Sequence, residues 1–206
     1  PMEYYDVNLN GTLNLLREIK YDNFVFASTG AAADPKSPYG LSKRVCEDYV
    51  RALAPIHTIF RFYNVTGTEG FPATNPDGLF YNLTEATKTG QFNLYGTNYN
   101  TKDGTCVRDY VHVEDIARAH LIALNTSKIT AGIYNLGSNR GTSNHEIIMA
   151  AQQVTTRVPQ IRVGERRAGD PAVLAASSEK FDLVAGEWRR WNLNDMVRHA
   201  WEWYNR

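Results

Sequence analysis

The 206-residue sequence has little cysteine, no net charge and no long hydrophobic run, and each absence excludes a class of protein. Its two cysteines, Cys46 and Cys106, form neither a disulfide framework nor a zinc-binding cluster, which favours a reducing compartment. The 22 Lys and Arg residues balance 22 Asp and Glu residues, so we expect no general attraction to nucleic acid or anionic lipid. No apolar stretch approaches the ~20 residues of a membrane-spanning helix, and the N-terminus does not resemble a signal peptide. We therefore expect a cytoplasmic protein that binds neither nucleic acid nor membrane.

Helical and strand patterns alternate in the N-terminal part of the sequence. Small or apolar residues recur at helical spacing between Asn8 and Ile19, and a second helical stripe runs from Tyr39 to Leu53. Each is followed by a short apolar run, at 24–27 and 58–63, of the kind that forms a strand buried on both faces of a parallel sheet. Helix alternating with buried strand predicts an α/β fold.

The sequence beyond residue 67 continues the alternation after a loop at 68–78 that is rich in Gly, Pro and Asn. Apolar spacing predicts helices at 80–88, 114–124, 144–154 and 193–204. It predicts strands at 92–95, 106–113 and 133–136.

Polar side chains with acid–base potential lie where the first predicted strand gives way to the next helix. Ser28 and Thr29 end the strand, and Tyr39 and Lys43 lie four residues apart on the helix. Residues at this spacing share a helix face, and a nearby ammonium favours the phenolate form of a tyrosine. With a hydroxyl from the strand end, the group could move a proton to or from a carbinol or carbonyl. The spacing alone is also common by chance, so the pair by itself would be read as structural.

Five segments together resemble one enzyme family. Residues 37–43 (SPYGLSK) are similar to the active-site segment of extended short-chain dehydrogenases/reductases. Four others resemble the UDP-glucose (galactose) 4-epimerase branch: 4–12 (YYDVNLNGT), 61–67 (RFYNVTG), 103–113 (DGTCVRDYVHV) and 166–171 (RRAGDP). The matches come in family order and extend over the whole chain.

The resemblance implies a partial Rossmann-like, doubly wound parallel sheet followed by a smaller C-terminal α/β substrate domain. Residues 1–67 would form the C-terminal part of the dinucleotide-binding domain. Residues 68–206 would form mainly the UDP-sugar domain, with segments near 105–136 returning to the Rossmann sheet. The cofactor would be NAD, but no Gly-x-x-Gly-x-x-Gly fingerprint occurs in the sequence, so we expect the chain alone to bind NAD poorly and to lack robust turnover. Family resemblance also implies a homodimer or other self-association.

The resemblance assigns roles to individual residues. Tyr39 would be the acid/base at the sugar 4-hydroxyl, Lys43 would support it and bind the nicotinamide ribose, and Thr29 would supply the partner hydroxyl. NAD would contact Asn8, Tyr39, Lys43 and Phe62. The UDP-sugar would contact Asn64, Asn82, Leu83, Phe92, Tyr95, Arg108, Arg167 and Asp170. Arg108 and Arg167 match the arginines that hold the two phosphates, for which a planar guanidinium is suited.

The implied reaction interconverts C4 epimers of UDP-glucose and UDP-galactose through transient oxidation to a 4-keto sugar. Two alternatives remain at this point: a catalytically silent nucleotide-sugar-binding module, or an epimerase of another UDP-sugar, a uronate or a pentose. A sugar dehydratase is disfavoured because no acidic residue follows Thr29 directly. The 30–38 linker is shorter than the family's usual loop, which leaves the placement of Thr29 beside Tyr39 open. The five histidines show no zinc-binding spacing, so no metal is expected.

Overall fold

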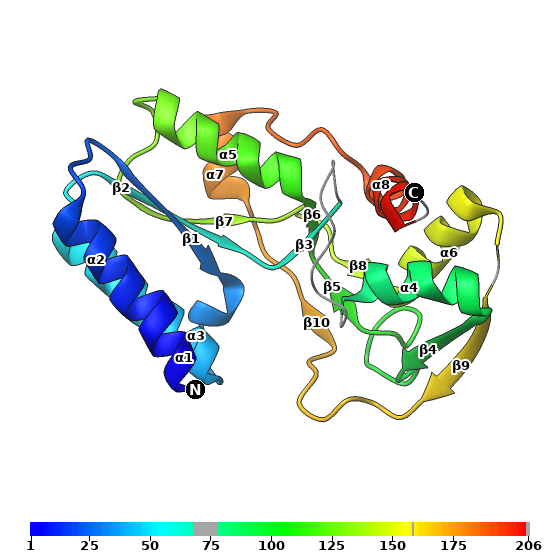
Figure 1. Ribbon diagram of the computed structural model, residues 1–206. Helices are drawn as coiled ribbons and strands as arrows, with labels where there is room; N and C mark the ends of the chain where they lie inside the picture. Colours follow the sequence, from blue (N-terminus) through cyan, green and yellow to red (C-terminus); the bar gives the residue numbers. More distant parts are fainter. Residues whose placement is uncertain (68–77, 158, 205–206) are drawn as a thin grey trace. The chain divides into compact units, whose positions relative to one another are not determined.

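The computed structural model describes residues 1–67, 78–157 and 159–204 (Figure 1). The helices are α1 (Met2–Tyr4), the π-helix η1 (Tyr5–Asn10), α2 (Gly11–Glu18), the 3-10 helix η2 (Gly30–Ala32), α3 (Pro38–Leu53), α4 (Leu79–Thr89), α5 (Val113–Asn125), α6 (Asn144–Thr155), α7 (Glu179–Ala185) and α8 (Leu193–Tyr204). The strands are β1 (Phe24–Thr29), β2 (His57–Phe62), β3 (Asn64–Thr66), β4 (Gln91–Tyr95), β5 (Val107–Arg108), β6 (Tyr110–His112), β7 (Gly132–Leu136), β8 (Thr142–Ser143), β9 (Gln160–Gly164) and β10 (Val173–Leu174).

Two compact units make up the chain. Unit 1 comprises Pro1–Tyr63, Ala117–Gly137 and Ala176–Trp188, and unit 2 comprises Asn64–Ile116, Ser138–Ala175 and Arg189–Arg206. Strand β7 belongs to unit 1, whereas β5 and β6 pair with strands of unit 2. The assignment of a dinucleotide-binding and a UDP-sugar domain to these parts of the chain stays a prediction.

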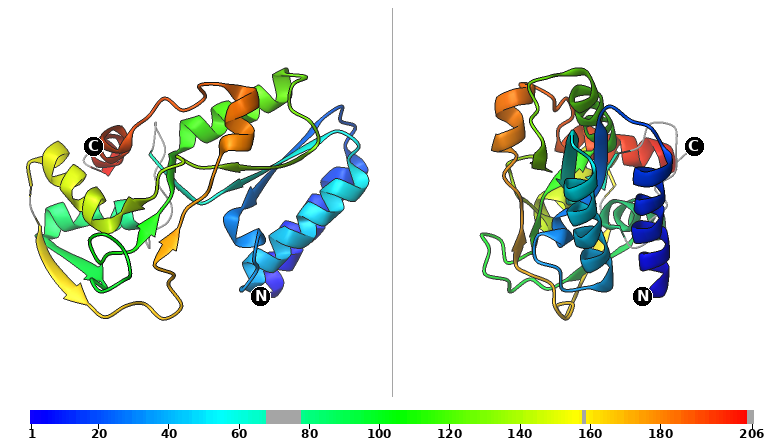
Figure 2. Two further views of the ribbon diagram at one scale, coloured as in Figure 1. Left: turned by 180° about the vertical axis from the view of Figure 1, so that it is seen from behind. Right: turned by 90° about the vertical axis from the view of Figure 1, so that its left-hand side faces the viewer.

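Unit 1 is built on a three-stranded parallel sheet in the order β1-β2-β7 (Figure 2). The register places Ser28 beside Arg61 and Thr29 beside Phe62. Parallel pairing of short apolar strands requires helical crossovers, which the intervening helices supply. The predicted α/β class with a parallel sheet is therefore confirmed.

Helices cover both faces of this sheet. On one face lie α2 and α3 (Figure 1). Their buried side chains Leu16, Cys46 and Val50 pack on Phe26 and Ile59 of the strands.

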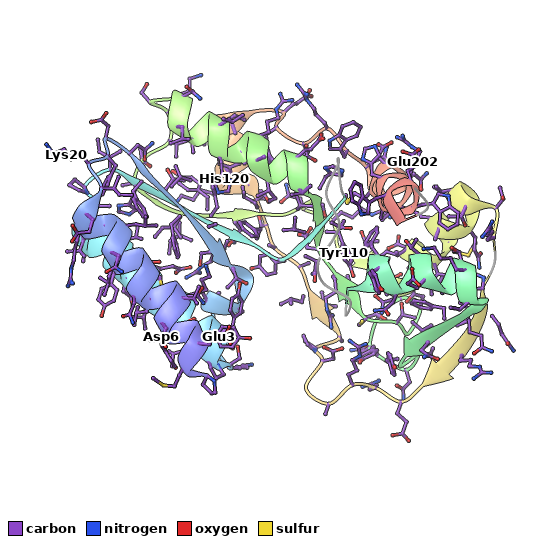
Figure 3. The ribbon with its side chains drawn as sticks, viewed as in Figure 1. Glu3, Asp6, Lys20, Tyr110, His120 and Glu202 are labelled. Carbon is purple, nitrogen blue, oxygen red and sulfur yellow. The ribbon has the colours of Figure 1, made fainter. Side chains whose placement is uncertain are left out.

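The other face of the sheet carries an aromatic group. Phe60 meets Phe181 of α7 and His120 of α5 edge-on, with ring centroids 5.0 and 5.1 Å apart, and Trp188 is fully buried against Phe181. Figure 3 shows His120 directed from α5 toward the strands. The two layers of helix bury most of the central strand β2, whereas Ala27 on the edge strand β1 is exposed, so the expected burial of 24–27 on both faces holds only in part.

The described residues of unit 2 form small sheets and the helices α4, α6 and α8, together with the first residues of α5. Its sheets are β10-β5-β8, β3-β6 and β4-β9. Its apolar core draws Phe80 and Leu83 from α4, Ile147 from α6 and Val197 from α8, and Tyr110 packs edge-on against Phe80 (Figure 3).

A pair of histidines is enclosed in unit 2. His112, at the end of β6, is fully buried, and its Nε2 lies 3.0 Å from Nδ1 of His199. Its Nδ1 accepts a hydrogen bond from the backbone N–H of Glu114, and the Trp191 ring lies against the imidazole. Burial, followed by the neighbouring His199, lowers the pKa of His112 to about 4.

The predicted strand at 106–113 is wrong as a single element, because the chain changes sheets at Asp109. The backbone N–H of Asp109 donates to the carbonyl of Leu174, and the Asp109 carbonyl accepts from the N–H of Asn64. The buried Asp109 carboxylate also accepts bonds of 2.7 Å from the N–H and hydroxyl of Ser138. These long-range partners divide the segment into β5 and β6, and Val113 begins α5.

The remaining predicted elements are present with boundaries shifted by a few residues, whereas α1, η2, α7, β3, β8, β9 and β10 were not predicted. The predicted loop at 68–78 lies outside the described residues except for Gly78. Within the described ranges no helix is both long and apolar enough to cross a membrane.

Candidate functional site

The C-terminal end of β1 carries the first predicted catalytic residue, Thr29. Its hydroxyl oxygen accepts a hydrogen bond from the N–H of Ala31 at 3.3 Å and so caps η2. Gly30 follows directly, and a Cβ at this position would lie 2.3 Å from the ring of Tyr63. A side chain at this position would have to displace the Tyr63 ring, which packs directly on the glycine.

The 30–38 linker is short but packs tightly on the start of α3. Ser37 caps the helix by accepting from the N–H of Gly40 at 3.1 Å, and Pro38 occupies the first turn. A Cβ at Gly40 would lie 2.7 Å from the carbonyl oxygen of Ala31, so the turn and the helix make a backbone contact. Arg44 adds a 3.2 Å bond to the carbonyl of Ala32. The strand end and the helix start therefore converge in spite of the linker's length.

Tyr39 and Lys43 lie one turn apart at the beginning of α3. The Tyr39 side chain is exposed and its ring packs against Tyr4, with centroids 5.6 Å apart. The Lys43 ammonium donates to the carbonyl of Ala27 at 3.2 Å and lies 5.1 Å from the centroid of the Phe26 ring. Because this placement partly buries the ammonium, the pKa of Lys43 is lowered. The Lys43 ammonium is thus held against β1 at Ala27, two residues before Thr29. A proton relay among Tyr39, Lys43 and Thr29 stays a prediction.

The other two predicted cofactor residues, Asn8 and Phe62, have different surroundings in unit 1. The amide of Asn8 donates to the Ser42 hydroxyl at 3.0 Å, and that hydroxyl donates to the Tyr39 carbonyl at 2.8 Å. Asn8 therefore braces the turn of α3 that carries Tyr39. Phe62 is half-buried at the end of β2, paired with Thr29 across the sheet. Contact of either residue with NAD stays a prediction.

A buried charge network at the same sheet end was missed from the sequence. Glu47 is fully buried on α3, and its Oε1 accepts from the Ser28 hydroxyl at 2.5 Å and from Arg61 Nε at 2.7 Å. Its Oε2 accepts from Arg61 Nη2 at 2.5 Å. This bidentate bond raises the pKa of Arg61. An arginine inside the apolar run 58–63 and a glutamate four residues after Lys43 were the signals that could have indicated the pair.

In unit 2, Arg108 and Asp170 form the core of the predicted phosphate- and ribose-binding group. The Arg108 guanidinium donates to the carbonyls of Val107 and Pro171, both at 2.9 Å, and its Nη2 lies 3.4 Å from Asp170 Oδ1. The Arg108 side chain is only 11% exposed, and its guanidinium is oriented by the two carbonyls and the Asp170 carboxylate. The pairing joins two predicted ligand residues that are 62 positions apart in the sequence.

Arg167, which precedes Asp170 by three positions in the sequence, stacks on an aromatic ring. Its guanidinium lies 4.6 Å from the centroid of the Tyr95 ring, and the neighbouring Arg166 stacks on Tyr99 at 4.3 Å. The turn that leads to Asp170 contains Gly169 at φ +81°, a left-handed conformation suited to glycine. Tyr95, Arg167 and the Arg108–Asp170 pair all lie in unit 2, and their contact with a UDP-sugar stays a prediction.

Four predicted substrate residues have other principal contacts. Leu83 and Phe92 are each 3% exposed within the core of unit 2, because alternation along β4 turns Phe92 inward. Their side chains serve packing, and we do not carry them into the proposed binding set. Asn64 and Asn82 are accessible but donate to the carbonyls of Asp109 and Gly78 at 3.2 and 3.0 Å.

Residues 1–137 match the family model described as the NAD dependent epimerase/dehydratase family. The chain belongs to this family. It is 34% identical to the UDP-glucose 4-epimerase of Lactobacillus helveticus over 99% of this chain and 71% of that protein. Two solved structures are similar over the whole chain. The UDP-glucose-4-epimerase from Stenotrophomonas maltophila with bound NAD and formylated UDP-arabinopyranose has a TM-score of 0.90, with 30% identity and 70% of that chain covered.

The second structure is the UDP-glucose 4-epimerase from Bifidobacterium longum in complex with NAD+ and UDP, with a TM-score of 0.82, 28% identity and 71% of that chain covered. These relatives agree with the family that the five motifs indicate, and the expected Rossmann-like fold is confirmed. Among the residues that the structure describes, no group of His, Cys, Asp and Glu side chains could hold a metal ion.

Proposed function

We propose that this chain acts in the interconversion of UDP-glucose and UDP-galactose at C4, with NAD as the redox cofactor. The observation that carries the proposal is the packing of the start of α3, which bears Tyr39 and Lys43, on the end of β1 and the turn after Thr29. In open parallel α/β sheets, ligands bind outside the carboxyl ends of the strands. Relatives that are UDP-glucose 4-epimerases support the substrate class.

The donors at this end of β1 fit the nicotinamide end of a dinucleotide. Lys43 carries three N–H donors, one of which bonds to Ala27, and Thr29 and Tyr39 each carry a hydroxyl. Such groups match ribose hydroxyls and a sugar alcohol. When bound, NAD would supply the hydride acceptor for the sugar C4. Lys43, Tyr39, Asn8 and Phe62 would hold its nicotinamide side.

The chain's own contribution to the chemistry is proton handling. Tyr39 would take the proton of the sugar 4-hydroxyl through its phenolic oxygen and return it in the reverse direction. The Lys43 ammonium would stabilise the phenolate by its charge. Thr29 would donate a hydrogen bond to the same sugar oxygen and keep it oriented toward Tyr39.

Residues of unit 2 would hold the UDP part of the substrate. Arg108 and Arg167 would bind the diphosphate, because a guanidinium can donate two parallel hydrogen bonds to phosphate oxygens. Asp170 would accept from the uridine ribose, exchanging its contact with Arg108 for one with the nucleotide. Asn64, Asn82 and Tyr95 complete the proposed set.

The test is conversion of UDP-galactose at NAD concentrations high enough to offset the weak NAD binding expected of this chain, together with calorimetric titration of UDP. We expect Tyr39→Phe to abolish turnover while UDP affinity stays the same, because the phenolic oxygen acts only on the sugar. Tyr21→Phe is the control, since it removes a phenolic oxygen from a ring that packs on the core of unit 1. Turnover that persists in Tyr39→Phe would refute the assignment. UDP binding without turnover in the unsubstituted chain would instead indicate a silent binding module.

Arginine substitutions test the nucleotide site separately. Arg108→Ala should weaken UDP binding by roughly 10²-fold, the worth of a charge-assisted bidentate contact. Arg140→Ala is the control, because Arg140 lies in the same unit in an exposed pair with Glu146. Equal UDP affinity for the two variants would remove Arg108 from the site.

A further inference from the structure

The Glu47 carboxylate links three elements of unit 1 from a fully buried position. Its three hydrogen bonds reach Ser28 on β1 and both the Nε and Nη2 of Arg61 on β2, while Glu47 itself lies on α3. Ser28 and Arg61 are neighbours in the parallel register. The carboxylate therefore spans the junction between the two strands from the helix above them.

The position of Glu47 on α3 relates it to the proposed catalytic residues. Tyr39, Lys43 and Glu47 follow one another at steps of four residues, which places them along one side of the helix, about 6 Å apart per step. Two polar bonds thus attach α3 to β1: Lys43 to the carbonyl of Ala27 and Glu47 to the hydroxyl of Ser28. Both strand partners lie within two residues of Thr29.

The remaining contacts of α3 with the sheet do not define one register as sharply. Cys46 and Val50 of α3 are buried against Phe26 and Ile59, and apolar contacts of this kind have no directional requirement. A bidentate arginine–carboxylate bond has a fixed planar geometry, and a buried pair that separates leaves two uncompensated charges. The network therefore selects one position of the helix on the strands.

We propose that Glu47 is a positioning residue, which through Ser28 and Arg61 holds α3 where Lys43 and Tyr39 meet the Thr29 end of β1. Its catalytic consequence rests on the proposed function, whereas the positioning itself can be measured without turnover.

The ionisation of Lys43 distinguishes positioning from simple stabilisation. Removing the negative charge of Glu47 would by itself lower the pKa of Lys43, because a nearby anion favours the ammonium. Release of Lys43 into water would raise its pKa, because burial is the main cause of the present lowering. The two effects have opposite signs, so the direction of the change reports whether the helix has moved.

The experiment compares Glu47→Gln with the unsubstituted chain after ¹³C-methylation of its lysines, with pH titration by NMR and the Lys43 signal identified from Lys43→Arg. We expect the Lys43 pKa to rise toward its ordinary value of 10.5 in Glu47→Gln. In turnover, kcat should fall roughly tenfold or more with little change in KM, because misplacement affects the reacting geometry more than binding. Asp48→Asn is the matched control: it removes the same charge from the next residue, in an exposed pair with Arg51.

An unchanged or lower Lys43 pKa in folded Glu47→Gln would overturn the proposal, and so would an equal rise in Asp48→Asn. If Glu47→Gln does not fold, the double variant Glu47→Gln/Arg61→Gln, which buries no uncompensated charge, takes its place. Failure of both to fold would show that Glu47 serves stability, and would also overturn the proposal. If the unsubstituted chain does not convert UDP-galactose even at saturating NAD, the proposed function fails, while the Lys43 titration still decides the role of Glu47.

Discussion

Gly40, next to the proposed acid/base Tyr39, is a position where a single methyl group should have a measurable cost. A Cβ there would lie 2.7 Å from the carbonyl oxygen of Ala31, whereas ordinary contacts begin near 3.4 Å. The obstructing atom belongs to the backbone of η2, so the turn must move from α3 by about 0.7 Å. Such overpacking costs ~1–3 kcal/mol, against ~1 kcal/mol gained from the better helix propensity of alanine.

Gly11→Ala supplies the control that separates these two contributions. Gly11 is also helical, at φ −58° and ψ −48°, and no atom lies within 4 Å of the position of its Cβ. Gly11→Ala should therefore stabilise unit 1 by ~1 kcal/mol. Because the propensity gain is common to both substitutions, the difference between them isolates the contact with Ala31, which we expect to be ~1–3 kcal/mol.

Hydrogen exchange followed by mass spectrometry is the suitable assay, because it reports the opening free energy of α3 without requiring the two units to unfold together. Peptides from 38–53 should exchange faster in Gly40→Ala than in Gly11→Ala. If the two variants protect these peptides equally, the close contact between η2 and α3 does not exist in solution. The convergence of strand end and helix start would then lose its main support.

Three further substitutions probe unit 2. The free energy of unfolding of unit 2 should fall by roughly 3 kcal/mol as pH decreases from 6.5 to 4, because the pKa of His112 is lowered to about 4 in the folded state and the unfolded chain binds the proton first. His112→Gln should flatten this pH dependence in urea titrations, and an unchanged dependence would refute the role of His112. Ser143→Ala should cost ~1 kcal/mol by removing the capping box that Ser143 forms with Glu146 at the start of α6, measured by thermal unfolding, with an unchanged midpoint as the contrary result. Gly169→Ala should weaken UDP binding, because alanine disfavours φ +81° and the exposed turn relaxes out of the conformation that precedes Asp170. The same relaxation keeps the midpoint of unfolding nearly constant, and equal UDP affinity by calorimetry would contradict this.

Local sequence patterns were sufficient for the elements whose burial follows from a single period. The helical spacing of Cys46 and Val50 predicted α3, and the apolar run at 24–27 predicted β1 as a strand of a parallel sheet. The spacing of Tyr39 and Lys43 also put both on one face of α3 without knowledge of the rest of the fold. In these cases the decisive contacts are made within the element or on one apolar side of it.

Features that depend on distant partners were not predictable from such patterns. The division of 106–113 at Asp109 depends on Leu174 and Ser138, which no local period reveals. The short strand β9 is only partly apolar and exists because it pairs with β4. The Glu47–Arg61 pair likewise requires α3 to be docked on β2 before its two members meet. Phe92 was assigned to the substrate from the resemblance, but strand alternation directs it into the core.

The scarcity of cysteine provides a native means of observing the two units one at a time. Cys46 is inaccessible in unit 1, where its Sγ contacts the carbonyl of Asn8, and Cys106 is buried in unit 2, where its Sγ accepts from the Asn144 amide. A thiol reagent can therefore reach each sulfur only when the surrounding structure opens. With one cysteine replaced at a time, the labelling rate of the other measures how often its own unit opens, and no extrinsic probe has to be introduced.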